Sequence, residues 1–231
     1  MYFGLFYLDW TLLLLVPGLL LGLWAQYLIK SRFKHYSQIR SRRGLSGAQT
    51  AAHLLADAGL ADVEIEVAGG RLSDHYDPRK RKLRLSPDTA HSCSVAALGV
   101  AAHEVGHAVQ HARDYFPLHL RNAAVPATRI GSWLFLPLFI AGLIFSLEPL
   151  IWIGVGLFAF TVVFQLVTLP VEFNASRRAL AMLGDGGYLD PDEIGGARKV
   201  LGAAALTYVA GLVTSLLMLL RLLLLAGFGR R

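Results

Sequence analysis

The sequence predicts a mainly α-helical membrane protein with about four transmembrane helices and a small α+β domain between the first two. Of the 231 residues, 55% are hydrophobic and only 16% are charged, whereas soluble domains carry about 25% charged residues. The mean hydropathy is +0.49, and the apolar residues gather into long runs. These observations exclude a disordered chain and an ordinary soluble globule.

The transmembrane helices are predicted from the runs that lack charge. Residues 10–29 and residues 200–220 contain no charged side chain, and residues 130–171 contain one, Glu148, which precedes a proline. Because one spanning helix needs about 20 apolar residues, the longest run predicts two helices joined by a tight turn. A cleaved signal peptide is the alternative for the first run, but the residues before that run include no Lys or Arg.

These runs divide the chain into five expected segments. They are an N-terminal transmembrane helix (1–29), a polar domain (30–129), a transmembrane helical hairpin (130–171), a second polar segment (172–199) and a C-terminal transmembrane helix (200–228). Lys and Arg residues crowd between positions 30 and 43, directly after the first span, so the positive-inside rule places both polar segments in the cytoplasm. In this topology the last helix places the C-terminus outside the cytoplasm, whereas Arg230 and Arg231 favour the cytoplasmic side.

The net charge of +6 is explained by the same basic cluster. Basic residues that flank a span are attracted to anionic lipid head groups, so the lipid bilayer is the expected partner and nucleic acid is not. The single cysteine, Cys93, excludes an intramolecular disulfide and a multi-cysteine metal site.

The polar domain shows a sequence of short elements. Residues 46–59 have the apolar spacing of a helix behind a Ser N-cap, and residues 63–67 alternate as a β-strand does. Residues 72–86 contain an Asp-Pro turn and predict a β-hairpin, in which strand 82–86 is the charged edge of the sheet. Residues 92–113 predict a long, Ala-rich helix.

This helix carries the segment His103-Glu104-Val105-Gly106-His107. Histidines four residues apart face the same side of a helix, so both imidazoles can reach one zinc ion. Glu104 is then placed to act as general base on the attacking water. The alternative is a core helix whose histidines only make hydrogen bonds, but two imidazoles and a carboxylate are costly to bury on an otherwise apolar helix.

A catalytic zinc site needs a third protein ligand. His111 lies one turn beyond His107, about a helical pitch away from an ion held by the first two histidines. His75, on the predicted hairpin, is a second alternative. Glu172 is the strongest candidate, because this carboxylate lies at the end of the third span, two residues after Pro170, and the helix with the two histidines still lacks a third ligand. A solvated charge at a helix end is the alternative interpretation of this glutamate.

The motif HEVGH, followed far downstream by Glu172 in the segment EFNASRRA, resembles the gluzincin metalloproteases that are embedded in membranes. Residues 72–79, 100–110 and 169–173 are similar to the bacterial YugP-type neutral zinc metallopeptidases, and the resemblance covers most of the chain. It implies a zincin-like endopeptidase domain in a multi-pass protein of the bacterial inner membrane. It also implies one Zn²⁺ held by His103, His107 and Glu172, with Glu104 as catalytic base.

One position departs from the related HtpX and CAAX-protease groups, which carry an Asp four residues after the ligand Glu. Ser176 stands at that position here. In those relatives the Asp orients a zinc-binding histidine. The sequence offers Asp77 or a backbone carbonyl as its replacement.

The position of Glu172 near the membrane face and the needs of peptide hydrolysis predict the substrates, the element that binds them and the donors to the oxyanion. Because Glu172 is close to the expected cytoplasmic end of a span, we expect membrane or unfolded proteins to be cut near that face. Strand 82–86 would bind an extended substrate by strand addition. Candidate donors to the oxyanion are His75, Tyr76, Tyr208 and Arg178. A non-catalytic zinc scaffold is the alternative function, and Glu104 argues against it because a structural site needs no adjacent base.

Overall fold

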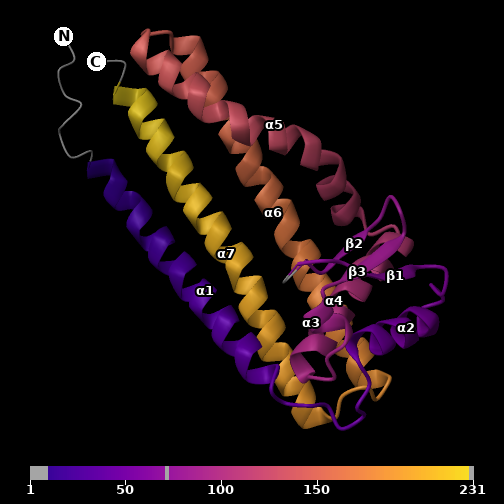
Figure 1. Cartoon of the computed structure of the whole chain (residues 1–231). Helices are drawn as coiled ribbons and strands as arrows, with labels where there is room; N and C mark the ends of the chain where they lie inside the picture. The colour runs from indigo at the N-terminus through magenta and orange to yellow at the C-terminus, as the bar shows by residue number, and fades with distance from the viewer. Residues whose placement is uncertain (1–9, 71–72, 229–231) are drawn as a thin grey trace. The chain divides into compact units, whose positions relative to one another are not determined.

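Helices dominate the computed structural model, which describes residues 10–70 and 73–228 (Figure 1). Four helical segments are long and apolar enough to cross a membrane, as predicted. The first joins a 3₁₀ turn (Trp10–Leu15) to α1 (Val16–Tyr36), and the others are α5 (Phe116–Ile144), α6 (Glu148–Asp185) and α7 (Pro191–Phe228). The expected mainly α fold class with a small α+β portion is therefore confirmed.

The remaining elements are short and lie between α1 and α5 in the sequence. They are α2 (Gly47–Asp57), β1 (Glu64–Val67), β2 (His75–Asp77), β3 (Lys82–Leu85), α3 (Pro87–Ala90) and α4 (Val95–Ala112). Serine side chains begin two of these helices. Ser46 and Gln49 form a capping box at α2, and Ser94 accepts the Ala97 N–H at the start of α4. Each cap satisfies backbone donors that would otherwise have no partner.

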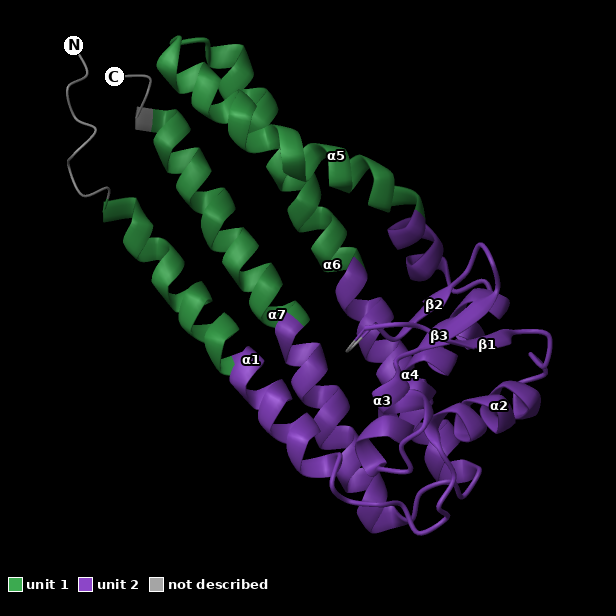
Figure 2. Cartoon of the chain, viewed as in Figure 1, with its two compact units in different colours: residues 1–24, 123–167, 208–231 green, residues 25–122, 168–207 purple. Residues whose placement is uncertain are grey.

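The chain forms two compact units to which the four long helices all contribute (Figure 2). Unit 1 comprises residues 1–24, 123–167 and 208–231, and unit 2 comprises residues 25–122 and 168–207. In the described part of unit 1 the charged side chains are Arg129, Glu148 and Arg221. Large apolar side chains are exposed on unit 1, with Trp133 79% exposed. Such a surface is typical of segments that face lipid.

The sheet belongs to unit 2 and has the strand order β1-β3-β2. The prediction that strand 82–86 is an edge strand was therefore wrong, because β3 is the central strand. It pairs with β2 in the antiparallel hairpin and with β1 in parallel. Lys82 Nζ lies 3.0 Å from Glu64 Oε2, and Arg84 Nε lies 3.3 Å from Glu66 Oε2, so the basic residues of β3 pair with the acids of β1. Leu72, which the hairpin prediction included, lies outside the described residues.

Helix α6 extends well past the apolar run that predicted it. The run ends at Val171, but the helix continues to Asp185, so Glu172 lies inside a helix and not at its end. Within unit 2 the core joins α2, β3, α4, α6 and α7 through fully or almost fully buried side chains, among them Leu54, Leu83, Leu98, Leu183 and Leu201. This core holds α4 against the second half of α6, and the two helices carry the candidate site.

Candidate metal centre

Helix α4 presents two histidines from consecutive turns. The ring centroids of His103 and His107 are 4.8 Å apart, and the rings are nearly perpendicular, at 86°. The side of α4 that carries Leu98, Ala101 and Val105 is completely buried. This packing fixes the helix, and with it the direction of both imidazoles.

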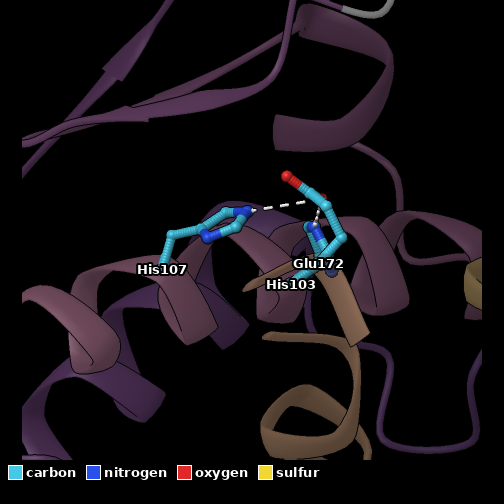
Figure 3. A group of neighbouring side chains, drawn as sticks. All are labelled: His103, His107 and Glu172. Atoms are coloured by element: carbon cyan, nitrogen blue, oxygen red, sulfur yellow. Dashed lines mark ion pairs between the residues drawn. The ribbon is translucent and has the colours of Figure 1, made fainter. Parts of the chain in front are cut away.

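Helix α6 brings the carboxylate of Glu172 to both imidazoles (Figure 3). Glu172 Oε2 lies 3.3 Å from His103 Nε2 and 3.7 Å from His107 Nε2. The three side chains each offer a ligand atom, and these atoms all lie within 4.8 Å of one another. Two ligand atoms on a tetrahedral zinc ion, with bonds of about 2.0–2.1 Å, are about 3.3 Å apart. The donor set and its spacing therefore fit a zinc ion.

A close approach of the two helices makes this spacing possible. At Gly106, between the histidines, an added Cβ would lie 2.7 Å from the carbonyl oxygen of Ala175 and 3.2 Å from its Cα. Only glycine fits so near a neighbouring backbone. Ala175 is itself completely buried and lies almost one turn after Glu172. Small residues on both helices thus allow the carboxylate to reach the imidazoles.

Gln110 of α4, which is completely buried, fixes the orientation of His107 and is itself held by hydrogen bonds that it donates to α6. Gln110 Nε2 donates to the carbonyl oxygen of Val171 at 2.8 Å and to Asn174 Oδ1 at 2.9 Å. Both amide hydrogens are therefore used, and Gln110 Oε1, 3.0 Å from His107 Nδ1, must accept the Nδ1–H. The Nε2 lone pair of His107 is left for the metal centre.

Ser176 orients His103 in the same way. Its Oγ lies 3.1 Å from His103 Nδ1, so the hydroxyl can accept the Nδ1–H and leave Nε2 free. The expectation that Asp77 or a backbone carbonyl makes this contact was wrong. Asp77 Oδ1 instead accepts the N–H groups of Arg79 and Lys80 in the turn after β2. Ser176, whose side chain is neutral, therefore provides the contact that orients His103.

The general-base candidate Glu104 is buried and held by the sheet. Its Oε2 accepts the backbone N–H of Tyr76, in β2, at 3.1 Å. This N–H consequently points away from β3, toward α4. The edge of the sheet thus holds the carboxylate beside the two histidines of the same helix.

The electrostatics of the centre favour a cation. Burial by itself lowers the pKa of His107, but the carboxylates of Glu172 and Glu104 outweigh it, so the pKa of His107 is raised. The two acids stabilise positive charge at this imidazole. A divalent metal would place its charge at the same point.

The other residues proposed from the sequence make different contacts. His75 is exposed, and its Nδ1 lies 2.7 Å from the carbonyl oxygen of Ser73. His111 Nδ1 lies 3.0 Å from the hydroxyl of Tyr76, and burial lowers the pKa of His111. Arg178 donates from Nε to Asn174 Oδ1 at 2.7 Å, which supports the contact of this amide with Gln110. Tyr208 belongs to unit 1.

Arg121, in the first turns of α5, was not singled out in the sequence. Its Nη2 lies 3.6 Å from Glu172 Oε1, the carboxylate oxygen that does not face the histidines. The two residues are 51 positions apart, and no local pattern connects them. Only the folded structure places this guanidinium group beside the candidate metal centre.

Comparisons with known proteins identify the family of the chain. Residues 11–227 match the family model described as "Putative neutral zinc metallopeptidase". The chain is 44% identical to the "Putative membrane protease YugP" of Bacillus subtilis (strain 168) over 217 residues, which cover 94% of this chain and 96% of that protein. No solved structure matches the chain. The chain therefore belongs to the family that its matching model describes as putative neutral zinc metallopeptidases.

Proposed function

We propose that this protein is a zinc-dependent endopeptidase of the gluzincin type. His103, His107 and Glu172 hold one Zn²⁺, and Glu104 is the catalytic base. The observation that carries the proposal is the convergence of the three ligand atoms within 4.8 Å of one another. Glu104, on the helix that carries both histidines, is held by the Tyr76 N–H, and a purely structural zinc site would not need this carboxylate.

The residues of the site have distinct roles in peptide hydrolysis. When bound, zinc supplies Lewis acidity toward the scissile carbonyl and lowers the pKa of water to about 7. Glu104 accepts a proton from the attacking water and delivers it to the leaving amine. Gln110 and Ser176 keep the two Nε2 atoms directed at the metal. The Tyr76 N–H keeps the carboxylate of Glu104 in a fixed position for both proton transfers.

Strand β2 is the element best placed to bind an extended substrate. Among the described strands it pairs only with β3, and its other edge faces α4 at Tyr76. The Tyr76 N–H at this edge is held by Glu104, so a peptide that ran along β2 past Glu104 would donate to the Tyr76 carbonyl oxygen, a main-chain contact that selects little for side chains. The proposed substrates are therefore unfolded or extended segments of proteins. The sequence suggested strand 82–86 for substrate binding, but that strand is central in the sheet. We therefore assign substrate binding to residues 75–77 of β2.

We further propose that the active site faces the cytoplasm from a multi-pass protein of the bacterial inner membrane. The few charges of unit 1 and the basic residues that follow the first span support this topology. The substrates would then be membrane proteins, or unfolded proteins, at the cytoplasmic face. Cys93, the single cysteine, lies in the polar segment. In intact cells an impermeant maleimide should not label Cys93 but should label Ser146→Cys, in the turn between α5 and α6, in a Cys93→Ser background.

Cleavage by the wild type and by Glu104→Gln tests the enzymatic proposal. Both proteins are purified in detergent with zinc, then incubated with casein and with a membrane-anchored reporter that carries an unfolded segment. We expect the wild type to cut at least one substrate and Glu104→Gln to cut neither. Equal cleavage by both proteins would contradict the role of Glu104. Zinc binding without cleavage by either protein would favour the scaffold function instead.

A further inference from the structure

Arg121 places a positive charge beside the candidate metal centre from a third helix. Its Nη2 lies 3.6 Å from Glu172 Oε1, while Glu172 Oε2 faces the two histidines. The carboxylate therefore lies between the imidazoles of α4 and the guanidinium group of α5. All of these residues belong to unit 2.

The donors of Arg121 are not used by this ion pair. A separation of 3.6 Å exceeds the distance of an N–H···O hydrogen bond, which is about 2.7–3.2 Å. Its Nε is buried and has no hydrogen-bond partner within the described chain. A buried donor without an acceptor is costly, so a guanidinium group with a purely structural role should have its donors satisfied. Its side chain is 28% exposed, so part of the guanidinium-bearing side chain is open to solvent.

Three of the other donors considered for the oxyanion are engaged or directed elsewhere. The hydroxyl of Tyr76 hydrogen-bonds with His111, and Arg178 donates to Asn174. His75 is exposed and contacts the backbone of Ser73. Of these groups and Arg121, only Arg121 combines a permanent charge, unused N–H donors and a position beside a ligand candidate.

We propose that Arg121 is a catalytic residue that donates hydrogen bonds to the substrate carbonyl oxygen during hydrolysis. The inference rests on the proposed function. As the water oxygen bonds to the carbonyl carbon, the π electron pair of the C=O bond moves to the carbonyl oxygen, and Glu104 takes the proton. Arg121 stabilises the negative charge that forms on this oxygen, through charge-assisted hydrogen bonds. When the C–N bond breaks, the carbonyl forms again and the amine receives the proton from Glu104.

The test separates this role from a role in holding Glu172. Wild type, Arg121→Gln and Arg121→Lys are compared with Arg129→Gln, an exposed arginine on the same helix. Four quantities are measured: the zinc Kd by chelator competition, kcat and KM for one peptide, and the Kd of the phosphonamidate analogue of that peptide. The phosphonamidate is tetrahedral and anionic, so its affinity reports on oxyanion binding even in a protein that does not turn over.

We expect Arg121→Gln to bind zinc as the wild type does, with little change in KM. Its kcat and its affinity for the phosphonamidate should both fall by about 10²–10³-fold, the usual cost of losing an oxyanion donor. Arg121→Lys should recover part of both losses, and Arg129→Gln should lose neither. If Arg121→Gln does not fold, Arg121→Lys is compared with the wild type in its place. A partial loss of kcat and of phosphonamidate affinity, with unchanged zinc affinity, then supports the role of Arg121.

Two results would overturn the inference. The first is a loss of zinc affinity in Arg121→Gln that accounts for its loss of activity, which would make Arg121 a positioning residue for Glu172. The second is unchanged affinity of the zinc-loaded variant for the phosphonamidate. Failure of the wild type to cut any peptide would count against the proposed function, and the phosphonamidate comparison would still decide the role of Arg121.

Discussion

Replacement of Gly106 by alanine is expected to weaken zinc binding, because it forces α4 and α6 apart at the metal centre. The new Cβ would lie 2.7 Å from the carbonyl oxygen of Ala175, whereas ordinary contact begins at 3.4 Å. The helices must therefore separate locally by about 0.7 Å, the difference between these two distances. Metal–ligand distances tolerate about 0.2 Å, and Glu172 lies almost one turn before Ala175 on the displaced helix. We expect zinc affinity to fall at least about tenfold, as for the loss of an outer-shell contact.

The same substitution has two opposed effects on stability. Alanine is favoured over glycine inside a helix by about 1 kcal/mol, while overpacking at a tight contact costs about 1–3 kcal/mol. The net result is a destabilisation of about 0–2 kcal/mol, so the melting temperature should fall or stay constant. At Gly195 in α7, an added Cβ meets nothing within 4 Å. Gly195→Ala should therefore raise the melting temperature and leave zinc affinity unchanged.

Zinc affinity by chelator competition and melting by circular dichroism, both in one detergent, measure these effects. Gly99→Ala serves as a control within α4, because its Cβ would lie in ordinary contact, 3.4 Å from the Ala197 Cβ. The reasoning is refuted if Gly106→Ala binds zinc like the wild type and melts at a higher temperature. That result would mean that helix propensity alone governs the position and that the helices do not meet as described.

Three further predictions concern the surroundings of the site. Ser176→Ala and Gln110→Ala should each reduce zinc affinity about 10–100-fold in the same competition assay, because each removes the partner that orients a histidine; unchanged affinity would contradict these contacts. The pKa of His107 is raised in the metal-free protein, so a proton competes with zinc there. A titration should show zinc affinity falling as the pH drops through this raised pKa, starting at a higher pH than for an unperturbed histidine, and a flat profile would count against it. Arg42→Ala removes only exposed ion pairs, so zinc affinity should not change and the melting temperature should change little, because such pairs contribute little.

The sequence was most informative where the signal is local. The capping pair Ser46 and Gln49 and the cap Ser94 lie within one helical turn of the donors that they satisfy, so they are visible as short patterns. The charge-free runs predicted four long helices for a similar reason, since each run is continuous in the chain. The segment from His103 to His107 needs only the helical repeat to bring its two imidazoles to one side.

The sheet order could not be predicted in the same way. Residues 82–85 alternate charged and apolar side chains, which is typical of an edge strand. The structure instead places β1 beside β3 in parallel, with Lys82 against Glu64. A parallel neighbour is not connected by a short turn, so no local pattern indicated it. A charge also does not end a helix, and α6 therefore continues past Glu172 until the glycines that follow Asp185.

Contacts around the metal centre depend on residues that are far apart in the chain. Gln110 meets Asn174 across 64 positions, and Ser176 meets His103 across 73. Arg121 and Glu172 meet only because α5 and α6 both contribute to unit 2. The ligand candidates were found from the helical spacing of the two histidines, from the position of Glu172 at the end of a span, and from the resemblance of these segments to a known family. The orienting amide, hydroxyl and guanidinium groups have many uses, and only the packing of the helices selects among them.

The zinc content of three proteins tests the central claim most directly, namely that His103, His107 and Glu172 bind one ion beside Glu104. Wild type, Glu104→Gln and Glu172→Ala are purified in the same detergent, dialysed against a weak chelator, and analysed for zinc per chain by mass spectrometry. The account predicts about one zinc per chain in the wild type and in Glu104→Gln, as expected for a single catalytic site, and much less in Glu172→Ala. Equal zinc in all three proteins would contradict the claim, because the carboxylate that α6 places at 3.3 Å from His103 Nε2 would then not be a ligand.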